Sequence, residues 1–216
     1  MSRSDAPTFG LRPSAGKSGL LLLFDLGGVL LDAFPRRAVE CFAKLSGREV
    51  AKLEAPILEV AKLAFDGGRV DPAGFARLVC DACGRRLTLE QVHDCWCAIF
   101  EDLPEMQQFT ERLAKAHACY LLSNTDPWHY QVAMKRLPWL GTFRGHCLSY
   151  EARRLKPDPE YYRAMFKRFQ LEPGDCVLVD DRAENVDAIV ALGAQGIVHR
   201  NVAATAASLA QLGVRA

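Results

Sequence analysis

A short apolar run, Leu20–Phe24, ends at Asp25, and two glycines, Gly27 and Gly28, follow almost at once. An apolar run without polar alternation is typical of a strand that is buried on both faces of a parallel sheet. Ligands of open α/β sheets bind at the carboxyl ends of the strands, and glycines let the backbone turn sharply and approach a ligand closely. The run therefore favours an α/β fold with Asp25 at its binding edge, as a nucleophile or a metal ligand.

The second half of the chain alternates between strand-like and helix-like segments. The strand-like segments lie at residues 118–122, 145–149, 176–179 and 196–199. The helical patterns lie at residues 104–116, 128–137, 159–169, 183–192 and 202–212. Alternation of this kind predicts a parallel sheet with helices packed against it.

Residues 34–103 show successive helical patterns and no comparable strand. Asp71 before Pro72 indicates a helix N-cap with proline at the first helical position. Thr88 and Gln91 have the spacing of a capping box. The sequence therefore predicts a helical insert after the first strand of the sheet.

Residues 1–19 are polar, rich in glycine, proline and serine, and without the apolar stretch of a secretory signal, so we expect a disordered tail. Gly16-Lys17-Ser18 looks like the end of a phosphate-binding P-loop, but it precedes the first strand, whereas a P-loop follows one. The predicted division is a tail at 1–19, a core at 20–33 and 104–216, and a helical cap at 34–103.

Composition narrows the classes of partner. The chain has 216 residues and a net charge of +1, which gives no reason to expect nucleic acid or an acidic membrane surface as partner. No apolar run approaches the roughly 20 residues of a membrane helix. Eight cysteines without an export signal predict reduced thiols and a cytoplasmic protein. The sequence leaves monomer and homodimer both open.

Four polar sites follow, or lie close to, the predicted core strands. They are Asp25, Ser123 with Asn124, Lys156, and Asp180 with Asp181. Parallel strands bring such sites together at one edge of the sheet. The sequence therefore predicts that residues far apart in the chain form one site.

The chemistry of these groups is complementary and suits phosphoryl transfer. Asp25 can attack phosphorus and form an aspartyl-phosphate, which divides hydrolysis into two steps. Ser123 and backbone N–H groups near Asn124 can hold the phosphoryl oxygens. Lys156 can neutralise the phosphate and keep Asp25 ionised. Arg36, where the predicted cap begins, is a further candidate contact for an anionic substrate.

The acidic residues also predict a metal site. Asp180 and Asp181 would repel each other without a cation. Carboxylate oxygens are the ligands that Mg²⁺ prefers. Together with Asp25 and a backbone carbonyl at Gly27, they form a candidate Mg²⁺ site.

Four segments, taken in order, resemble the haloacid dehalogenase superfamily of hydrolases. They are FDLGGVL at 24–30, LLSNT at 121–125, LKPDPEYY at 155–162 and VLVDDRAEN at 177–185. The resemblance implies a doubly wound, parallel, Rossmann-like sheet with an inserted all-helical cap. It also implies an enzyme of the phosphatase type, closest to the branch with sugar-phosphate phosphatases, acting on a small phosphorylated metabolite.

The family pattern implies the role of each site residue. Asp25 is then the nucleophile, while Ser123 and Lys156 hold the phosphoryl group. Asp180 and Asp181 bind Mg²⁺, and Asn185 supports the loop that carries them.

The chain departs from the phosphatase pattern at Gly27, where a second aspartate usually acts as general acid and base. Losing such a group typically costs about 10²–10⁴-fold in rate. Either another group donates the proton, with His93, Glu40 and Asp32 as candidates, or the leaving group needs none, as in a glycosyl-1-phosphate or an acyl phosphate. The third possibility is that the protein is a poor enzyme.

Two other functions remain open. A 2-haloacid dehalogenase also lacks the second aspartate, but Asp180 and Asp181 would then be idle. A catalytically weak member would bind a phosphorylated ligand or a partner protein.

The cysteines of the insert invite a zinc interpretation, which the pattern opposes. Cys80 and Cys83 have a spacing suited to a ligand pair. Cys95 and Cys97, however, would point about 200° apart on a helix. A role as small core residues is more in keeping with this arrangement.

Overall fold

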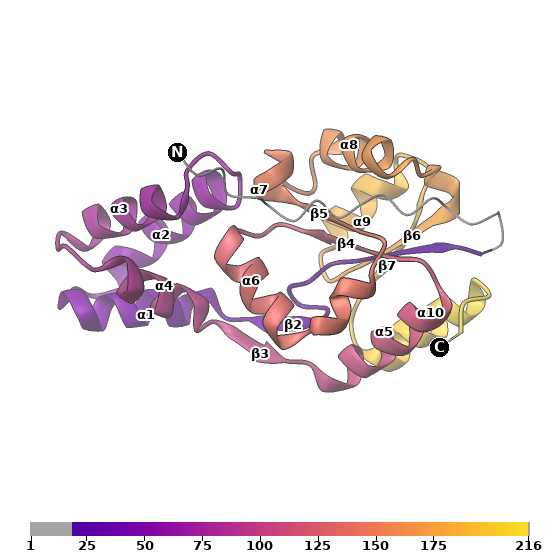
Figure 1. The fold of residues 1–216 in the computed structure, drawn as a ribbon, viewed down its shortest axis with the longest axis horizontal. Helices are drawn as coiled ribbons and strands as arrows, with labels where there is room; N and C mark the ends of the chain where they lie inside the picture. The colour runs from indigo at the N-terminus through magenta and orange to yellow at the C-terminus, as the bar shows by residue number, and fades with distance from the viewer. Residues whose placement is uncertain (1–18, 216) are drawn as a thin grey trace, which may run out of the picture.

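The computed structural model describes residues 19–215, and its centre is a parallel sheet (Figure 1). Within these residues the sheet has five strands in the order β5-β4-β1-β6-β7. Their bounds are β1 Leu21–Phe24, β4 Cys119–Ser123, β5 Gly145–Leu148, β6 Cys176–Asp180 and β7 Gln195–Val198. The doubly wound α/β fold expected from the sequence is confirmed. The predicted tail, apart from its last residue, and the Gly16-Lys17-Ser18 segment lie outside the described residues.

Alternate residues of the central strand face two different layers of helices. Leu22 and Phe24 belong to one buried cluster, and Leu23 belongs to another. The first cluster includes side chains of α5 Pro104–Ala116, α6 Pro127–Arg136 and α10 Val202–Gln211. The second includes side chains of α8 Pro159–Phe169 and α9 Ala183–Val190. Burial on both faces explains why β1 has no polar alternation.

The register of the sheet brings the candidate site residues to one edge. Phe24 pairs with Leu121 on one side and with Val179 on the other. The strands β1, β4 and β6 therefore end within two residues of one another along the register. The N–H of Asp25, which follows β1, donates to the carbonyl of Val179 at 3.0 Å. Ser123 and Asp180 are the last residues of β4 and β6.

The insert forms a helical group beside the sheet (Figure 1). Its helices are α1 Pro35–Ser46, α2 Val50–Val60, the π-helical turn η1 Ala61–Phe65, α3 Pro72–Cys83 and α4 Leu89–Cys97. The expected caps are present: the Asp71 side chain accepts from the N–H of Gly74, and Thr88 and Gln91 make a reciprocal capping box.

A two-stranded antiparallel ribbon joins the insert to the core. It pairs β2 Leu31–Ala33 with β3 Phe100–Asp102. The expectation of helices alone over residues 34–103 is therefore wrong at its last residues. Strands of three residues are too short to produce a period that a sequence can reveal.

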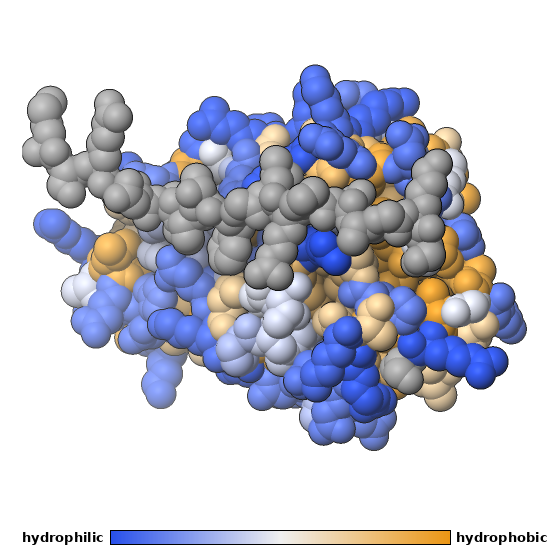
Figure 2. All heavy atoms as spheres, turned by 45° about the vertical axis from the view of Figure 1, so that its right-hand side comes forward, coloured by the Kyte–Doolittle hydropathy of each residue, from blue (hydrophilic) through white to orange (hydrophobic). Residues whose placement is uncertain are grey.

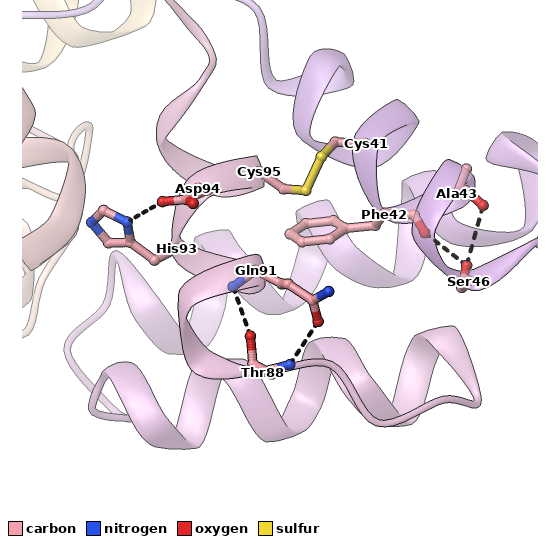
Figure 3. Close-up of a disulfide and its surroundings, with 9 residues drawn as sticks. All are labelled: Cys41, Phe42, Ala43, Ser46, Thr88, Gln91, His93, Asp94 and Cys95. Atoms are coloured by element: carbon pink, nitrogen blue, oxygen red, sulfur yellow. Dashed lines mark hydrogen bonds and ion pairs between the residues drawn. A yellow bond between two sulfur atoms is a disulfide. The ribbon is translucent and has the colours of Figure 1, made fainter.

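A disulfide between Cys41 and Cys95 links α1 to α4, the first and last helices of the insert (Figure 3). The expectation that all the cysteines are free thiols is therefore wrong for this pair. That expectation was based on the predicted cytoplasmic location. The sequence does not show that two helices distant in the chain lie side by side. Since Cys95 is bonded to Cys41, a zinc site that includes Cys95 is excluded.

Short helical turns complete the chain: η2 Pro138–Thr142, α7 Ser149–Ala152 and η3 Pro173–Asp175. Figure 2 shows one face of the molecule, where hydrophilic side chains surround smaller hydrophobic areas. Within residues 19–215, no helix combines the length and the apolar character needed to cross a membrane.

Candidate active site

A cavity of about 400 Å³ lies where the carboxyl edge of the sheet meets the insert. The core contributes Asp25, Gly27, Ser123, Asn124, Lys156, Asp181, Arg182 and Asn185 to its wall. The insert contributes Leu58, Ala61, Lys62, Asp66 and Trp96. Both parts of the chain therefore form the site.

The carboxylate of Asp25 has one oxygen held and one oxygen available. Oδ1 accepts from the N–H of Leu26 at 2.6 Å and lies 3.0 Å from Nζ of Lys156. Oδ2 makes no hydrogen bond with any residue from 19 to 215. Burial raises the pKa of Asp25 to about 7, aided by the charge of Asp180 and opposed by Lys156. The carboxylate is thus fixed in orientation with an oxygen left for a ligand.

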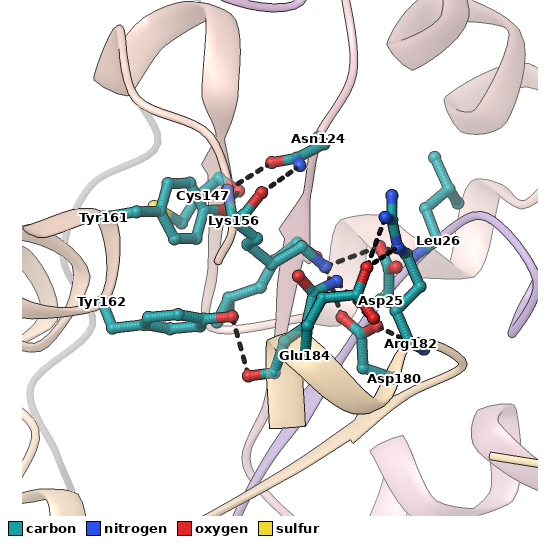
Figure 4. Close-up of polar contacts among 12 residues, drawn as sticks. Asp25, Leu26, Asn124, Cys147, Lys156, Tyr161, Tyr162, Asp180, Arg182 and Glu184 are labelled. Carbon is teal, nitrogen blue, oxygen red and sulfur yellow. Dashed lines mark hydrogen bonds and ion pairs between the residues drawn. The ribbon is translucent and has the colours of Figure 1, made fainter. Parts of the chain in front are cut away.

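Lys156 is buried and gives each of its three N–H donors to a different acceptor (Figure 4). Nζ lies 2.9 Å from the carbonyl of Leu122, 2.6 Å from Oδ2 of Asp180 and 3.0 Å from Oδ1 of Asp25. Burial opposes its charge, but the two carboxylates outweigh burial and raise the pKa of the ammonium group. Lys156 is therefore a fixed positive charge between two acids.

Asn124 fixes the backbone that carries this lysine. Its Nδ2 donates to the carbonyl of Lys156 at 2.9 Å, and its Oδ1 accepts from the N–H of Lys156 at 2.8 Å (Figure 4). Both polar ends of the Asn124 side chain are thus engaged within the protein, although the residue still lines the cavity. Ser123 is buried at the end of β4 and lines the same cavity.

Three carboxylates form a cluster that suits a hard cation. One oxygen each of Asp25, Asp180 and Asp181 lie within 4.8 Å of one another. Asp180 is oriented by the N–H of Arg182 at 3.0 Å and by Nδ2 of Asn185 at 2.8 Å. Burial and the neighbouring Asp180 raise the pKa of Asp181. A cation among these oxygens would relieve that repulsion.

Two further observations fit a bound metal ion. Oδ1 of Asn185 is buried and has no hydrogen-bond partner within the described part of the chain. A Cβ at Gly28 would lie 2.5 Å from Oδ2 of Asp181, and its φ is +70°. Glycine at this position therefore makes room for the Asp181 carboxylate beside the turn.

Some of the residues that the sequence suggested for the site lie outside the cavity. Arg36 is exposed and pairs with Glu40 at 3.1 Å and Glu54 at 3.9 Å, so the structure does not bring it to the cavity. Of the three candidate acids, Asp32 lines the cavity. Glu40 pairs with Arg36, and His93 lies 3.1 Å from its neighbour Asp94.

The structure adds cavity residues that the sequence did not single out. Lys62 and Asp66 project from η1 and the turn after it, and Arg182 follows the acidic pair. Leu58, Lys62 and Asp66 are spaced by four residues, which indicates a shared helical face. The spacing does not indicate that this face turns toward the core.

A second buried pair connects the insert to the core. Nδ1 of His129 lies 2.8 Å from Oδ2 of Asp126, and Nε2 lies 2.8 Å from the carbonyl of Trp96. The indole N–H of Trp96 also donates to Asp126 at 2.8 Å. Burial favours the neutral forms, but the contacts between the partners outweigh it, raising the pKa of His129 and lowering that of Asp126. His129 thus has both ring nitrogens engaged within the protein.

The haloacid dehalogenase-like hydrolase family matches residues 20–193. The chain belongs to this family of hydrolases.

Two relatives are named as enzymes, one as a phosphatase and one as a hydrolase. The chain is 28% identical over 175 residues to D-ribitol-5-phosphate phosphatase of Bacteroides thetaiotaomicron, covering 76% of this chain and 84% of that protein. It is also 28% identical over 200 residues to a chloroplast flavin mononucleotide hydrolase of Arabidopsis thaliana, covering 90% and 78%.

Solved structures show the same fold. A haloacid dehalogenase family enzyme of Bacteroides thetaiotaomicron superposes with a TM-score of 0.77 at 26% identity, covering 85% of this chain and 95% of that one. A complex of such an enzyme with magnesium and inorganic phosphate superposes with a TM-score of 0.75 at 24% identity, with the same coverage of both chains.

Proposed function

We propose that the protein is a Mg²⁺-dependent phosphatase that hydrolyses a small phosphorylated metabolite through an aspartyl-phosphate on Asp25. The observation that carries the proposal is the arrangement around this carboxylate. One oxygen is held by Leu26 and Lys156, the other is free, and a cluster of acids lies beside it in a cavity of about 400 Å³.

Each polar group has a distinct role in this proposal. Asp25 attacks phosphorus, and Lys156 orients it and offsets negative charge. Ser123 and the N–H groups after β4 hold phosphoryl oxygens, while the Asn124 side chain positions Lys156. Asp25, Asp180, Asp181 and the Gly27 carbonyl would hold Mg²⁺, which would neutralise charge on the phosphoryl group when bound.

The insert completes the site in this proposal. Residues 34–103 act as the cap, covering the phosphoryl site and selecting the rest of the substrate. The Bacteroides relative named as a ribitol-5-phosphate phosphatase and the Arabidopsis relative named as a flavin mononucleotide hydrolase support a phosphate monoester as substrate. A polyol or sugar phosphate is our first choice, because the cavity is small.

A 2-haloacid dehalogenase is the competing function. In that reaction Asp25 would attack carbon instead of phosphorus, and no metal would be required. The cluster of Asp25, Asp180 and Asp181 favours the phosphatase, because the carboxylates of Asp180 and Asp181 would repel each other in a reaction that uses no metal ion.

The two functions can be separated by product. Release of inorganic phosphate from a panel of polyol, sugar and nucleotide phosphates, and release of halide from 2-haloacids, should be measured with Mg²⁺ and with chelator. We expect phosphate release that depends on Mg²⁺ and no halide release. Halide release without metal would contradict the proposal.

A further inference from the structure

Hydrolysis of an alkyl phosphate leaves a basic oxygen that needs a proton in the transition state. The cavity therefore needs a group that can donate a proton near neutral pH. Gly27, two residues after the nucleophile, has no side chain to provide one. The donor has to come from elsewhere in the cavity wall.

Most polar groups on that wall are already engaged. Lys156 gives all three donors to protein acceptors. His129 has both ring nitrogens in contact with Asp126 and Trp96. Arg182 forms a close ion pair with Glu184. The carboxyl groups that remain outside the metal cluster are those of Asp32 and Asp66.

Asp66 is fixed in place by its backbone. Its carbonyl accepts a hydrogen bond at 2.6 Å from the hydroxyl of Ser149, which accepts at 2.9 Å from the N–H of Thr125. Thr125 lies two residues after Ser123, in the segment that we assign to the phosphoryl group. The following turn packs tightly on the core, because a Cβ at Gly68 would lie 2.0 Å from the carbonyl of Tyr150. Asp66 is thus held at the boundary between the cap and the phosphoryl site.

The Asp66 side chain is left free for a ligand. It is partly buried, and its carboxyl group makes no hydrogen bond or ion pair with any residue in the described range. The charged groups that act on it are Asp126, the N-cap residue of α6, His129 of α6 and Lys62 of η1. Burial, together with the charge of Asp126, raises the pKa of Asp66 to about 8. At neutral pH this carboxyl group therefore holds its proton and can donate it.

We propose that Asp66 is the general acid and base of the reaction, placed on the cap instead of two residues after the nucleophile. This inference rests on the proposed phosphatase function. Oδ2 of Asp25 forms a bond to phosphorus, the bond from phosphorus to the leaving oxygen breaks, and that oxygen takes the proton of Asp66. A water molecule then attacks phosphorus of the aspartyl-phosphate and gives a proton to Asp66. The bond between phosphorus and Oδ2 of Asp25 breaks, so that inorganic phosphate leaves and the Asp25 carboxylate is restored.

The consequence is that the acid already lies at the phosphoryl site before the substrate binds, because the backbone of Asp66 is bonded to the core through Ser149. The role also predicts a preference for substrates whose leaving group extends toward η1.

The test is the dependence of rate on the leaving group. kcat/KM should be measured with Mg²⁺ for a series of phosphate monoesters, from nitrophenyl phosphate through phenyl phosphate to alkyl phosphates. The variants are Asp66→Asn, Asp32→Asn for the other cavity acid, and Asp81→Asn as a matched change on an exposed part of the cap. We expect Asp66→Asn to lower kcat/KM for alkyl phosphates by about 10²–10⁴-fold while nitrophenyl phosphate loses less than about tenfold.

A pH profile gives a second readout. The wild-type rate on alkyl phosphates should fall as the pH rises above about 8, because the acid must hold its proton. Asp66→Asn should remove this fall, and Asp81→Asn should keep it. Activity on nitrophenyl phosphate shows that each variant is folded.

Several outcomes would overturn the inference. Equal losses on all substrates would assign Asp66 a structural role, and a selective loss in Asp32→Asn alone would assign the acid to Asp32. A wild type that hydrolyses only nitrophenyl phosphate would show that no acid assists the leaving group. A wild type that hydrolyses nothing with Mg²⁺ would instead refute the proposed function, and this inference with it.

Discussion

Replacing Lys156 with methionine removes a positive charge from between two buried carboxylates. The ammonium group makes hydrogen-bonded ion pairs with Asp180 at 2.6 Å and with Asp25 at 3.0 Å, and it satisfies the carbonyl of Leu122. Breaking a buried ion pair by removing one partner costs about 3–5 kcal/mol. We therefore expect Lys156→Met to lower the free energy of unfolding by about that amount at pH 8 without Mg²⁺.

The loss should depend on pH in a defined direction. The folded-state pKa of Asp25 is raised from 3.8 to about 7, so the stability that its protonated form contributes is complete below 3.8 and is lost as the pH rises through about 7. Lys156 lowers this pKa, so its removal raises the pKa further and deepens the loss above pH 7. At pH 5, where Asp25 holds its proton in both proteins, the difference should be smaller.

Urea unfolding in the presence of chelator measures both quantities, since the midpoint and the slope together yield the free energy of unfolding. Lys62→Met is the matched control, because Lys62 lines the same cavity but is exposed; its change should stay within about 0.5 kcal/mol. A loss below about 1 kcal/mol, or an equal loss at pH 5 and pH 8, would refute the electrostatic role assigned to Lys156.

Two further predictions concern the metal cluster and the contact between cap and core. Gly28→Ala should weaken Mg²⁺ binding more than Gly27→Ala in calorimetric titration, because a Cβ at Gly28 would lie 2.5 Å from Oδ2 of Asp181, whereas a Cβ at Gly27 would meet no atom within 4 Å. Equal affinities in the two variants would contradict this. The stability that His129 contributes is present below its unfolded pKa of 6.5 and is lost as the pH rises through its raised folded pKa. His129→Gln should therefore flatten the alkaline decline in unfolding free energy, and an unchanged pH profile would show that the histidine is not charged in the fold.

The sequence reveals the core and the sheet edge for a physical reason. A strand buried on both faces appears as an apolar run, and its end is marked by the first polar residue. Asp25, Ser123 and Asp180 could be located in this way from local sequence alone. Parallel pairing then brings them together, whatever the length of chain between them.

The cap side of the site could not be predicted in the same way. Helical spacing shows that Lys62 and Asp66 share a face, but which face meets the core depends on how the insert packs. The same limit applies to Arg36, whose charge suggested a phosphate contact but which pairs with two glutamates on the surface.

Contacts between segments that are distant in the chain could not be predicted from the sequence either. The disulfide between Cys41 and Cys95 joins residues 54 positions apart, and each cysteine lies in an ordinary amphipathic helix. The ribbon of β2 and β3 has three residues in each strand, too few for an alternating pattern.

The most direct test of the central claim is the hydrolysis of nitrophenyl phosphate by wild type and Asp25→Asn, each with Mg²⁺ and with chelator. This leaving group needs little protonation, so the absence of a side chain at Gly27 does not mask an active nucleophile. We predict activity in the wild type with Mg²⁺, and loss of that activity on chelation or in Asp25→Asn. Undiminished activity in Asp25→Asn, or no activity in folded wild-type protein with Mg²⁺, would contradict the assignment of Asp25 as the nucleophile of a phosphatase.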